Sequence, residues 1–259
     1  MPVALTIAGS DPSGGAGIQA DLKTFHQFGV YGEAAITLLT VQNTVGLYRV
    51  ECLAPDLVEQ QIRAVVQDIP PQAAKTGALG SRAVVEAIAL LAEEFTFPLI
   101  VDPVMVSKHG ALLLEPDACK LLISRAYLLT PNLPEAAALT GLEVTDLASM
   151  RQAAQALVAM GARNVLVKGG HLAFEATDVL LFEGTWFEFP ASRIQSQHTH
   201  GTGCTYSAAI TAGVALGHDL PTAVANAKQF IREAIRTAPG LGHGCGPLNH
   251  FVQNTGPKL

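Results

Sequence analysis

Short apolar runs alternate with longer helical stretches along most of this 259-residue chain. The runs, such as Val3–Ala8 and Leu99–Val101, are rich in the aliphatic and β-branched side chains that are typical of buried strands. A strand followed by a helix and another strand forms a right-handed crossover, and repeated crossovers build a mostly parallel sheet with helices on both faces. The pattern therefore predicts an α/β protein.

The remaining elements follow the same alternation. Predicted strands are Val3–Ala8, Glu33–Val41, Ala73–Thr76, Leu99–Val101, Tyr127–Leu129 and Asn164–Val167. Predicted helices lie near residues 15–28, 55–68, 81–94, 132–140, 146–160, 203–216 and 219–237. Two further strands, 178–182 and 185–189, flank Glu183-Gly184, a connection that predicts an antiparallel edge hairpin. With no linker or internal repeat, we expect a single domain, 1–259.

Composition excludes several classes of function. Charged residues make up 15% of the chain, and 22 acidic residues outnumber 16 basic ones. A nucleic-acid surface needs clustered positive charge, so we expect no nucleic-acid partner. We also expect no membrane partner, because the sequence has no apolar run of about 20 residues and no basic amphipathic helix. Four cysteines without a Cys-x-x-Cys pair fit a reducing compartment, so we expect a cytoplasmic protein.

A glycine-rich segment, residues 9–17, directly follows the first predicted strand. It contains Gly15-x-Gly17-x-x-Ala20, which formally matches a dinucleotide fingerprint. The glycines begin too far past the strand for a Rossmann turn, and no Lys completes a P-loop. Two interpretations stay open: a simple turn, or a loop that contacts a ligand at the carboxyl edge of the sheet.

A second glycine-rich segment, His200–Thr205, immediately precedes an apolar helix. Glycines at a helix N-terminus expose backbone N–H groups at the positive end of the helix dipole, which makes an anion site. The same field stabilises a thiolate, so the pKa of Cys204 is expected to fall below the usual ~8.5. The alternative is an inert, buried cysteine.

Polar residues follow several predicted strands, where the carboxyl ends of a parallel sheet meet. Asp102 and Glu135 could together hold Mg²⁺ through waters, although an Asp-Pro turn and a helix first-turn acid are the simpler interpretations. Lys168 could neutralise phosphate charge or be a solvated loop residue. Gln42 offers a donor and an acceptor to an aminopyrimidine edge, or caps its strand. Asp21 lies two turns into the first helix, where it could also be an exposed helical acid.

Seven stretches together resemble the hydroxymethylpyrimidine/phosphomethylpyrimidine kinases of thiamin biosynthesis, which have a ribokinase-like fold. They occur in the family order and cover nearly the whole chain: 8–24, 42–44, 102–105, 130–135, 168–171, 199–205 and 244–251. The resemblance implies a ribokinase-like three-layer sandwich with an antiparallel edge hairpin. It also implies phosphorylation of 4-amino-5-hydroxymethyl-2-methylpyrimidine by ATP, and then of its monophosphate to the diphosphate, with Mg²⁺ as a cofactor and a homodimer as the assembly.

The resemblance also implies roles for particular residues. Cys204 would be the base beside an anion hole formed by Gly201, Thr202 and Gly203. The pyrimidine would be bound by Gln42, Asp21 and Gly9. ATP would be bound by Lys168, Asn132 and Thr130, and Mg²⁺ by Asp102 and Glu135.

Two positions depart from the family pattern: Ala78 stands where Met is frequent, and His109 where a small residue is usual. Both departures bear on the shape of the substrate pocket and hence on substrate specificity.

Three alternative functions stay open. These are a pyridoxine/pyridoxal kinase of the same fold, a non-catalytic pyrimidine-binding sensor, and a nicotinamide-dependent oxidoreductase based on the formal Gly15-x-Gly17 match.

Overall fold

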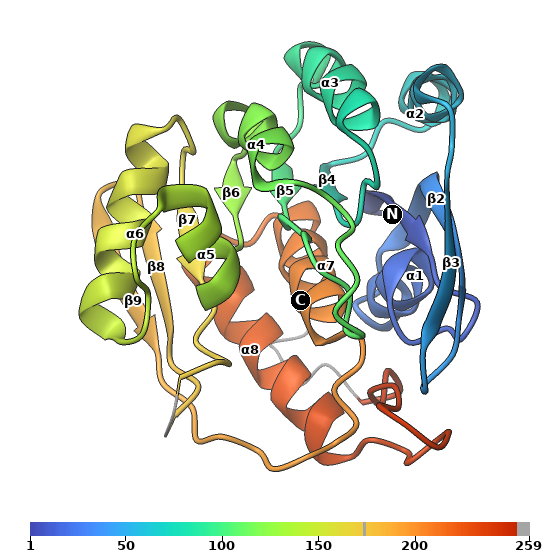
Figure 1. Ribbon diagram of the computed structural model, residues 1–259. Helices are drawn as coiled ribbons and strands as arrows, with labels where there is room; N and C mark the ends of the chain where they lie inside the picture. Colours follow the sequence, from blue (N-terminus) through green and yellow to red (C-terminus); the bar gives the residue numbers. More distant parts are fainter. Residues whose placement is uncertain (173–174, 253–259) are drawn as a thin grey trace.

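The computed structural model describes residues 1–172 and 175–252, in which the strands form one mixed sheet (Figure 1). The strand order is β3-β2-β1-β4-β5-β6-β7-β8-β9. The strands are β1 (Val3–Ser10), β2 (Tyr31–Gln42), β3 (Leu47–Cys52), β4 (Ala73–Thr76), β5 (Leu99–Val101), β6 (Leu128–Leu129), β7 (Val165–Val167), β8 (Asp178–Phe182) and β9 (Thr185–Phe189). Neighbouring strands from β2 to β7 are parallel, which confirms the predicted mostly parallel sheet.

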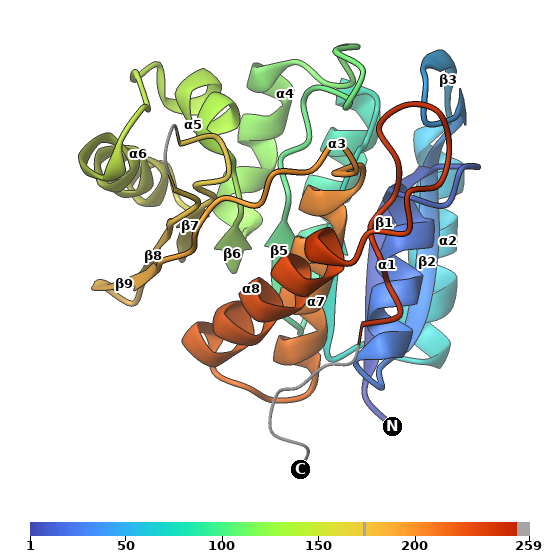
Figure 2. The same cartoon turned by 90° about the horizontal axis from the view of Figure 1, so that it is seen from below.

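Helices cover both faces of this sheet (Figure 2). They are α1 (Gly17–Gln27), α2 (Pro55–Asp68), α3 (Arg82–Leu91), α4 (Pro116–Cys119), α5 (Leu133–Thr140), α6 (Leu147–Ala159), α7 (Thr202–Ala215) and α8 (Leu220–Arg236), with short 3₁₀ helices at Ala92–Glu94 and Lys120–Arg125. Helices α2 to α6 pack on one face, and α1, α7 and α8 on the other. Alternate residues of β1 serve the two cores: Leu5 and Ile7 face the first, Ala4 the second.

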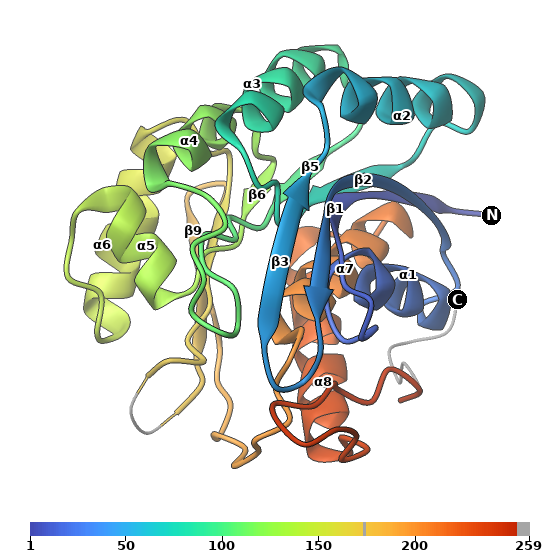
Figure 3. The same ribbon diagram turned by 45° about the vertical axis from the view of Figure 1, so that its right-hand side comes forward.

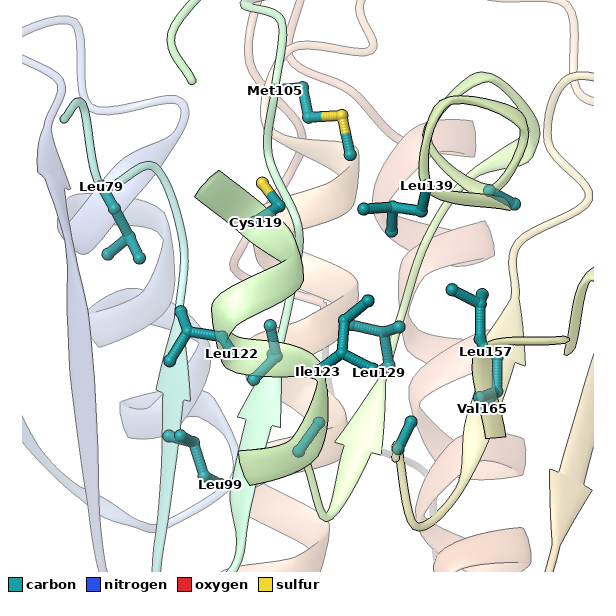
Figure 4. Packing of buried hydrophobic residues seen from close by; sticks show 14 of the residues in the cluster. Leu79, Leu99, Met105, Cys119, Leu122, Ile123, Leu129, Leu139, Leu157 and Val165 are labelled. Atoms are coloured by element: carbon teal, nitrogen blue, oxygen red, sulfur yellow. The ribbon is translucent and has the colours of Figure 1, made fainter. Parts of the chain in front are cut away.

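The first core is a continuous set of aliphatic side chains between the sheet and α2 to α6. Figure 4 shows Leu122 and Ile123, from the 3₁₀ helix, beside Leu99 of β5 and Leu129 of β6. Leu157 of α6 lies over Val165 of β7 in the same layer. This core holds the strand ends at fixed positions along the sheet.

Local sequence signals explain where several helices begin. Asp219 accepts a hydrogen bond from the Thr222 N–H, as expected for the N-cap of α8. Asn132 and Glu135 form a reciprocal capping box at the start of α5. At the hairpin between β8 and β9, Glu183 and Gly184 both have positive φ, as a two-residue turn requires. That hairpin is antiparallel, as predicted.

The sequence interpretation missed a second antiparallel edge. Strand β3 pairs with the end of β2, and this hairpin extends past the neighbouring strands (Figure 3). Its Tyr48, Arg49 and Glu51 side chains are all exposed, so β3 lacks the alternation of apolar and polar residues that marks a half-buried strand. Helix α4 and the 3₁₀ helix that follows were also missed, since both are too short to show a period. Across the described part of the chain, every helix is too short or too polar to cross a membrane.

Candidate active site

The residues singled out from the sequence lie at the carboxyl edge of the sheet, together with the N-terminus of α7. Gln42 ends β2, Asp102 follows β5, Thr130 follows β6 and Lys168 follows β7. Helix α7 begins on the same edge, because the Gly203 backbone lies close to the carboxylate of Asp102 and the ammonium of Lys168. An open α/β sheet binds its ligands at this edge.

The first turn of α7 presents unused backbone donors. Gly201, the N-cap, has φ +79° and lies so close to the Gly15 carbonyl that a Cβ there would be 1.8 Å from the oxygen. Within the described residues, the N–H groups of Gly203 and Cys204 have no acceptor. Two free amides at the positive end of a 14-residue helix form an anion site.

Cys204 does not have the lowered pKa that the sequence predicted. Burial, followed by the negative charges of Asp21 and Asp102, raises the pKa of its thiol to about 11. Lys75 and the Gly17 amide act in the opposite direction. The prediction was wrong because it considered the helix dipole alone, whereas burial and the negative charges of Asp21 and Asp102 also act on the thiol. A raised pKa favours the protonated form of Cys204.

Asp102 is the centre of a buried polar cluster. Its Oδ1 accepts hydrogen bonds from Lys168 Nζ at 2.7 Å and from Thr130 Oγ1 at 3.1 Å, and its Oδ2 accepts one from Ser207 Oγ of α7 at 3.3 Å. Although burial favours the neutral acid, Lys168 and Lys75 hold the pKa of Asp102 below its usual value. Thr130, predicted to bind nucleotide, thus supports Asp102 directly.

Glu135 and Asn132 are engaged with each other at the start of α5. Glu135 Oε2 accepts the Asn132 N–H at 2.8 Å, and Asn132 Oδ1 accepts the Glu135 N–H at 2.9 Å. Burial raises the pKa of Glu135 to about 7, and the nearby carboxylate of Asp102 raises it as well, while Lys168 lowers it. Both predicted ligands of Mg²⁺ therefore act on the same lysine.

Beneath this cluster lies an ion pair that the sequence interpretation did not foresee. Lys75 on β4 and Asp21 on α1 are both fully buried, and Lys75 Nζ donates to Asp21 Oδ2 at 2.8 Å. Thr6 Oγ1 donates to the same oxygen at 2.6 Å. Asp21 is therefore not on an exposed helix face. A lysine in the otherwise apolar run Ala73–Thr76 was the available signal, since a charge in a buried strand needs a partner.

The glycine-rich segment 9–17 is organised by Asp11. The Asp11 carboxylate accepts N–H groups of Ser13, Gly15 and Ala16, at 2.8, 3.1 and 2.8 Å. His200 Nε2 lies 2.9 Å from its Oδ2. Burial raises the pKa of Asp11, but these hydrogen bonds lower it more, to about 2. The amides that could cradle a phosphate are thus occupied by the protein's own carboxylate, which leaves the N-terminus of α7 as the anion site.

Gln42, the last residue of β2, lies beyond this cluster along the strand direction. Ser10 pairs with Leu39, so Gln42 lies three residues, about 10 Å, further along the strand direction. Two residues later, Thr44 accepts the Cys245 N–H at 2.8 Å through its carbonyl. Cys245 Sγ in turn lies 3.7 Å from Thr199 Oγ1, just before the anion site. At Gly9, near the end of β1, a Cβ would lie 2.6 Å from Leu38 Cδ1, so a side chain there would require Leu38 to move.

The loop after β5 reaches the β2–β3 turn. His109 Nε2 lies 3.3 Å from the Asn43 carbonyl, and its ring centroid is 6.3 Å from that of His200. His109, where the family pattern has a small residue, therefore links this loop to the strand that carries Gln42. Ala78 follows β4 at the same edge, and its carbonyl accepts a hydrogen bond from Thr37.

Comparison with known proteins places this arrangement in a family. Residues 11–249 match the sequence profile described as phosphomethylpyrimidine kinase. The chain belongs to the phosphomethylpyrimidine kinase family. Among its relatives, the hydroxymethylpyrimidine/phosphomethylpyrimidine kinase of Bacillus subtilis (strain 168) is 47% identical over 257 residues, covering 96% of this chain and 94% of the relative.

Solved structures agree with membership of the phosphomethylpyrimidine kinase family. The phosphomethylpyrimidine kinase of Clostridium difficile 630 superposes with a TM-score of 0.80 at 42% identity, covering 91% of this chain and all of that chain. The pyridoxal kinase of Bacillus subtilis, in an ADP complex, gives a TM-score of 0.88 at 38% identity over 96% of this chain and 97% of that chain. The expected ribokinase-like three-layer fold is confirmed.

Proposed function

We propose that this protein phosphorylates 4-amino-5-hydroxymethyl-2-methylpyrimidine with ATP, and then phosphorylates the monophosphate to the diphosphate, as a step of thiamin biosynthesis. One observation carries the proposal. In a chain of this family, the free amides that begin α7 converge with Cys204, Asp102 and Lys168 on one sheet edge. Such a set can neutralise the charge that spreads over a phosphoryl group during transfer.

In the first transfer the hydroxymethyl oxygen attacks the γ-phosphorus while Cys204, as thiolate, accepts the hydroxyl proton. The bond between the γ-phosphorus and the bridging oxygen of ATP breaks, and ADP leaves. The amides of the turn from Gly201 to Cys204 and the Lys168 ammonium stabilise the transferring group. In the second transfer the attacking oxygen belongs to a phosphate that is already ionised near neutral pH, so no strong base is needed.

The other residue roles form part of the same proposal. Gln42, at the end of β2, binds the amino and ring nitrogens of the pyrimidine. Asp21 and Gly9 shape the base of the pyrimidine pocket. Lys168 contacts ATP directly, while Asn132 and Thr130 act through Glu135 and Asp102, to which they are hydrogen-bonded.

The residues present fit a magnesium ion. Asp102 and Glu135 supply hard oxygen donors, and the negative charge of Asp102 raises the pKa of Glu135, a repulsion that a divalent cation relieves. The described residues contain no group of three or more His, Cys, Asp or Glu that could hold a metal. Mg²⁺ usually keeps several waters and binds through one or two carboxylates plus phosphate oxygens. Asp102 and Glu135 would hold it, and it would supply charge neutralisation at the phosphates.

Pyridoxal is the second candidate substrate, because a pyridoxal kinase is among the close structural neighbours and Ala78 leaves more room than Met. A coupled assay with ATP, Mg²⁺ and a panel of aminopyrimidine and pyridine alcohols tests both. We expect kcat/KM to be highest for the hydroxymethylpyrimidine. A higher value for pyridoxal would reverse the order, and ATP consumption without any heterocycle-dependent product would favour a non-catalytic sensor.

The proposal also covers the setting of the enzyme. We place it in the cytoplasm, where ATP is available and where its four thiols, free in this structure, stay reduced. The chain would act as a single domain and as a homodimer. Light scattering at micromolar concentration distinguishes a dimer from a monomer of 27.1 kDa.

A further inference from the structure

Lys75 is fully buried, which is rare for lysine unless its charge is paired. On β4, Lys75 faces the same side as Ala73, because alternate residues of a strand share a face. That side is covered by α1 and α7. The ammonium therefore lies in the layer between the sheet and the two helices that carry Asp21 and Cys204.

The pairing of Lys75 is incomplete. An ammonium group has three N–H donors, and Asp21 Oδ2 accepts one of them. Within residues 1–172 and 175–252, Lys75 Nζ has no second acceptor, and the buried Asp21 Oδ1 has no partner at all. The positive charge of Lys75 therefore also acts on other groups in this layer.

Cys204 is one of those groups. It lies in the first turn of α7, a helix that packs on both β4 and α1. The neighbouring Gly203 lies beside the Asp102 carboxylate and the Lys168 ammonium. Four charged groups therefore influence the sulfur: Asp21 from α1, Lys75 from β4, Asp102 after β5 and Lys168 after β7. Two are positive and two negative, so a thiolate would add a fifth charge without a counterion. The balance between Lys75 and Asp21, whose side chains are in contact, therefore governs whether the sulfur can carry a negative charge.

We propose that Lys75 is a positioning residue for phosphoryl transfer: its buried ammonium stabilises the thiolate form of Cys204, and Asp21 limits how much of that positive charge reaches the sulfur. The inference rests on the proposed function, in which this thiolate takes the proton of the substrate hydroxyl. In that step the O–H bond breaks and an S–H bond forms. The electron pair stays on the oxygen that attacks phosphorus.

The test is the pH dependence of alkylation of Cys204 by iodoacetamide, followed by peptide mass spectrometry on the full chain without substrate. Cys204 is half-buried, and iodoacetamide is a small reagent. Below the thiol pKa the rate is proportional to the thiolate fraction. We expect Lys75→Met to slow alkylation at pH 8.5 about tenfold or more, and Asp21→Asn to speed it up.

The opposite signs of these effects separate a charge effect from lost packing. Lys75→Met leaves a buried carboxylate unpaired and could unfold, so the double variant Asp21→Asn/Lys75→Met removes both charges together. Its profile should lie between those of the two single variants. Lys228→Met is the matched control, because Lys228 Nζ forms a comparable ion pair with Asp178 at 2.6 Å and should leave the profile unchanged. Shifts in the same direction for Lys75→Met and Asp21→Asn, or no shift, would overturn the inference.

Activity measurements keep this inference distinct from the proposed function. In a folded Lys75→Met variant, the first transfer should slow at least tenfold more than the second, which needs no thiolate. Opposite alkylation shifts in a protein that phosphorylates no heterocyclic alcohol would support the charge relation and reject the proposed function. Normal phosphorylation of the heterocycle, with alkylation profiles that do not change in the variants, would support the proposed function and reject the charge relation.

Discussion

Lys75 and Lys168 are both paired with a carboxylate, but their exposure separates their roles. The Lys168 side chain is 12% exposed, so its ammonium can meet a phosphate from solvent while it is held by Asp102. Lys75 is 0% exposed and can act only on its neighbours inside the protein. The pKa of the Cys204 thiol is raised, because burial and the negative charges of Asp21 and Asp102 outweigh the helix dipole and the positive charge of Lys75. Catalysis by this sulfur therefore depends on charges around it.

Replacing Cys204 with Ala should affect the two transfers unequally. We expect the first transfer to slow about 100-fold or more, the usual contribution of a general base, and the second to slow less than tenfold. Single-turnover assays with each substrate measure the two rates separately. Cys52→Ala, at an exposed position on β3, is the control and should change neither. A loss by the same factor in both steps would show that Cys204 is not the base.

Among the structural elements, two turns bring the site together. The glycine-rich segment after β1 is filled by the Asp11 carboxylate, and the same carboxylate contacts His200 at the turn before α7. In the β2–β3 turn, Thr44 accepts hydrogen bonds from backbone N–H groups of the segment 243–245. The anion site and the strand that carries Gln42 are thus held by segments about 200 residues apart in sequence.

The turn before α7 should not tolerate a side chain. Gly201→Ala would place a Cβ 1.8 Å from the Gly15 carbonyl oxygen in a left-handed backbone conformation. We expect kcat to fall about 100-fold, the typical effect of misplacing donors to a developing anion. Gly170→Ala is the control, because no atom of residues 1–172 or 175–252 lies within 4 Å of its Cβ position. Steady-state kinetics on both variants would contradict the expectation if kcat fell equally.

The fastening at the β2–β3 turn should influence substrate binding more than chemistry. Thr44 Oγ1 accepts the N–H groups of His243 and Gly244, at 3.2 and 3.3 Å. Thr44→Val loses both bonds at similar volume, at a cost of about 1 kcal/mol. We expect the KM for the pyrimidine to rise about fivefold with kcat within twofold, and Thr44→Ser to restore the KM. A fall in kcat at constant KM would argue against this role.

Taken as a whole, the molecule has buried ionisable side chains at both the carboxyl and the amino ends of its strands. Those at the carboxyl ends form ion pairs, whereas the one at the amino end does not. At the amino end, Glu33 on β2 is 6% exposed, and neither of its carboxylate oxygens has a partner among the described residues. Burial, followed by the negative charge of Asp68, raises its pKa from 4.5 to about 7. The folded protein therefore holds this proton more tightly than the unfolded chain, and Glu33 makes folding less favourable as pH rises from about 4.5 through 7.

Glu33→Gln should stabilise the protein in alkaline but not in acidic solution. At pH 8 the substitution removes a buried negative charge and should raise the free energy of unfolding by about 1–2 kcal/mol, whereas at pH 5 Glu33 is already neutral. Urea denaturation at the two pH values measures the difference. Glu143→Gln, at an exposed position, should have no effect at either pH. An equal gain at pH 5 and pH 8 would rule out ionisation as the cause.

The sequence by itself determined the order of the elements and the edge on which the polar residues gather. Alternation of strands and helices requires a parallel sheet, and the carboxyl ends of parallel strands lie together, so Asp102, Thr130 and Lys168 had to share one edge. Local chemistry likewise determined the Asp219 cap and the Glu183-Gly184 turn, since each needs only neighbouring residues.

Only the tertiary structure decided the state of the groups at that edge. The pKa of Cys204 was expected to be lowered and is raised, Asp11 occupies the amides of the first glycine-rich segment, and Lys75 is buried against Asp21, 54 residues away in sequence. A pKa depends on burial and on every charge within several ångströms, and these charges come from elements that no local pattern connects. Sequence could locate the site, but the protonation and pairing of its side chains followed from packing.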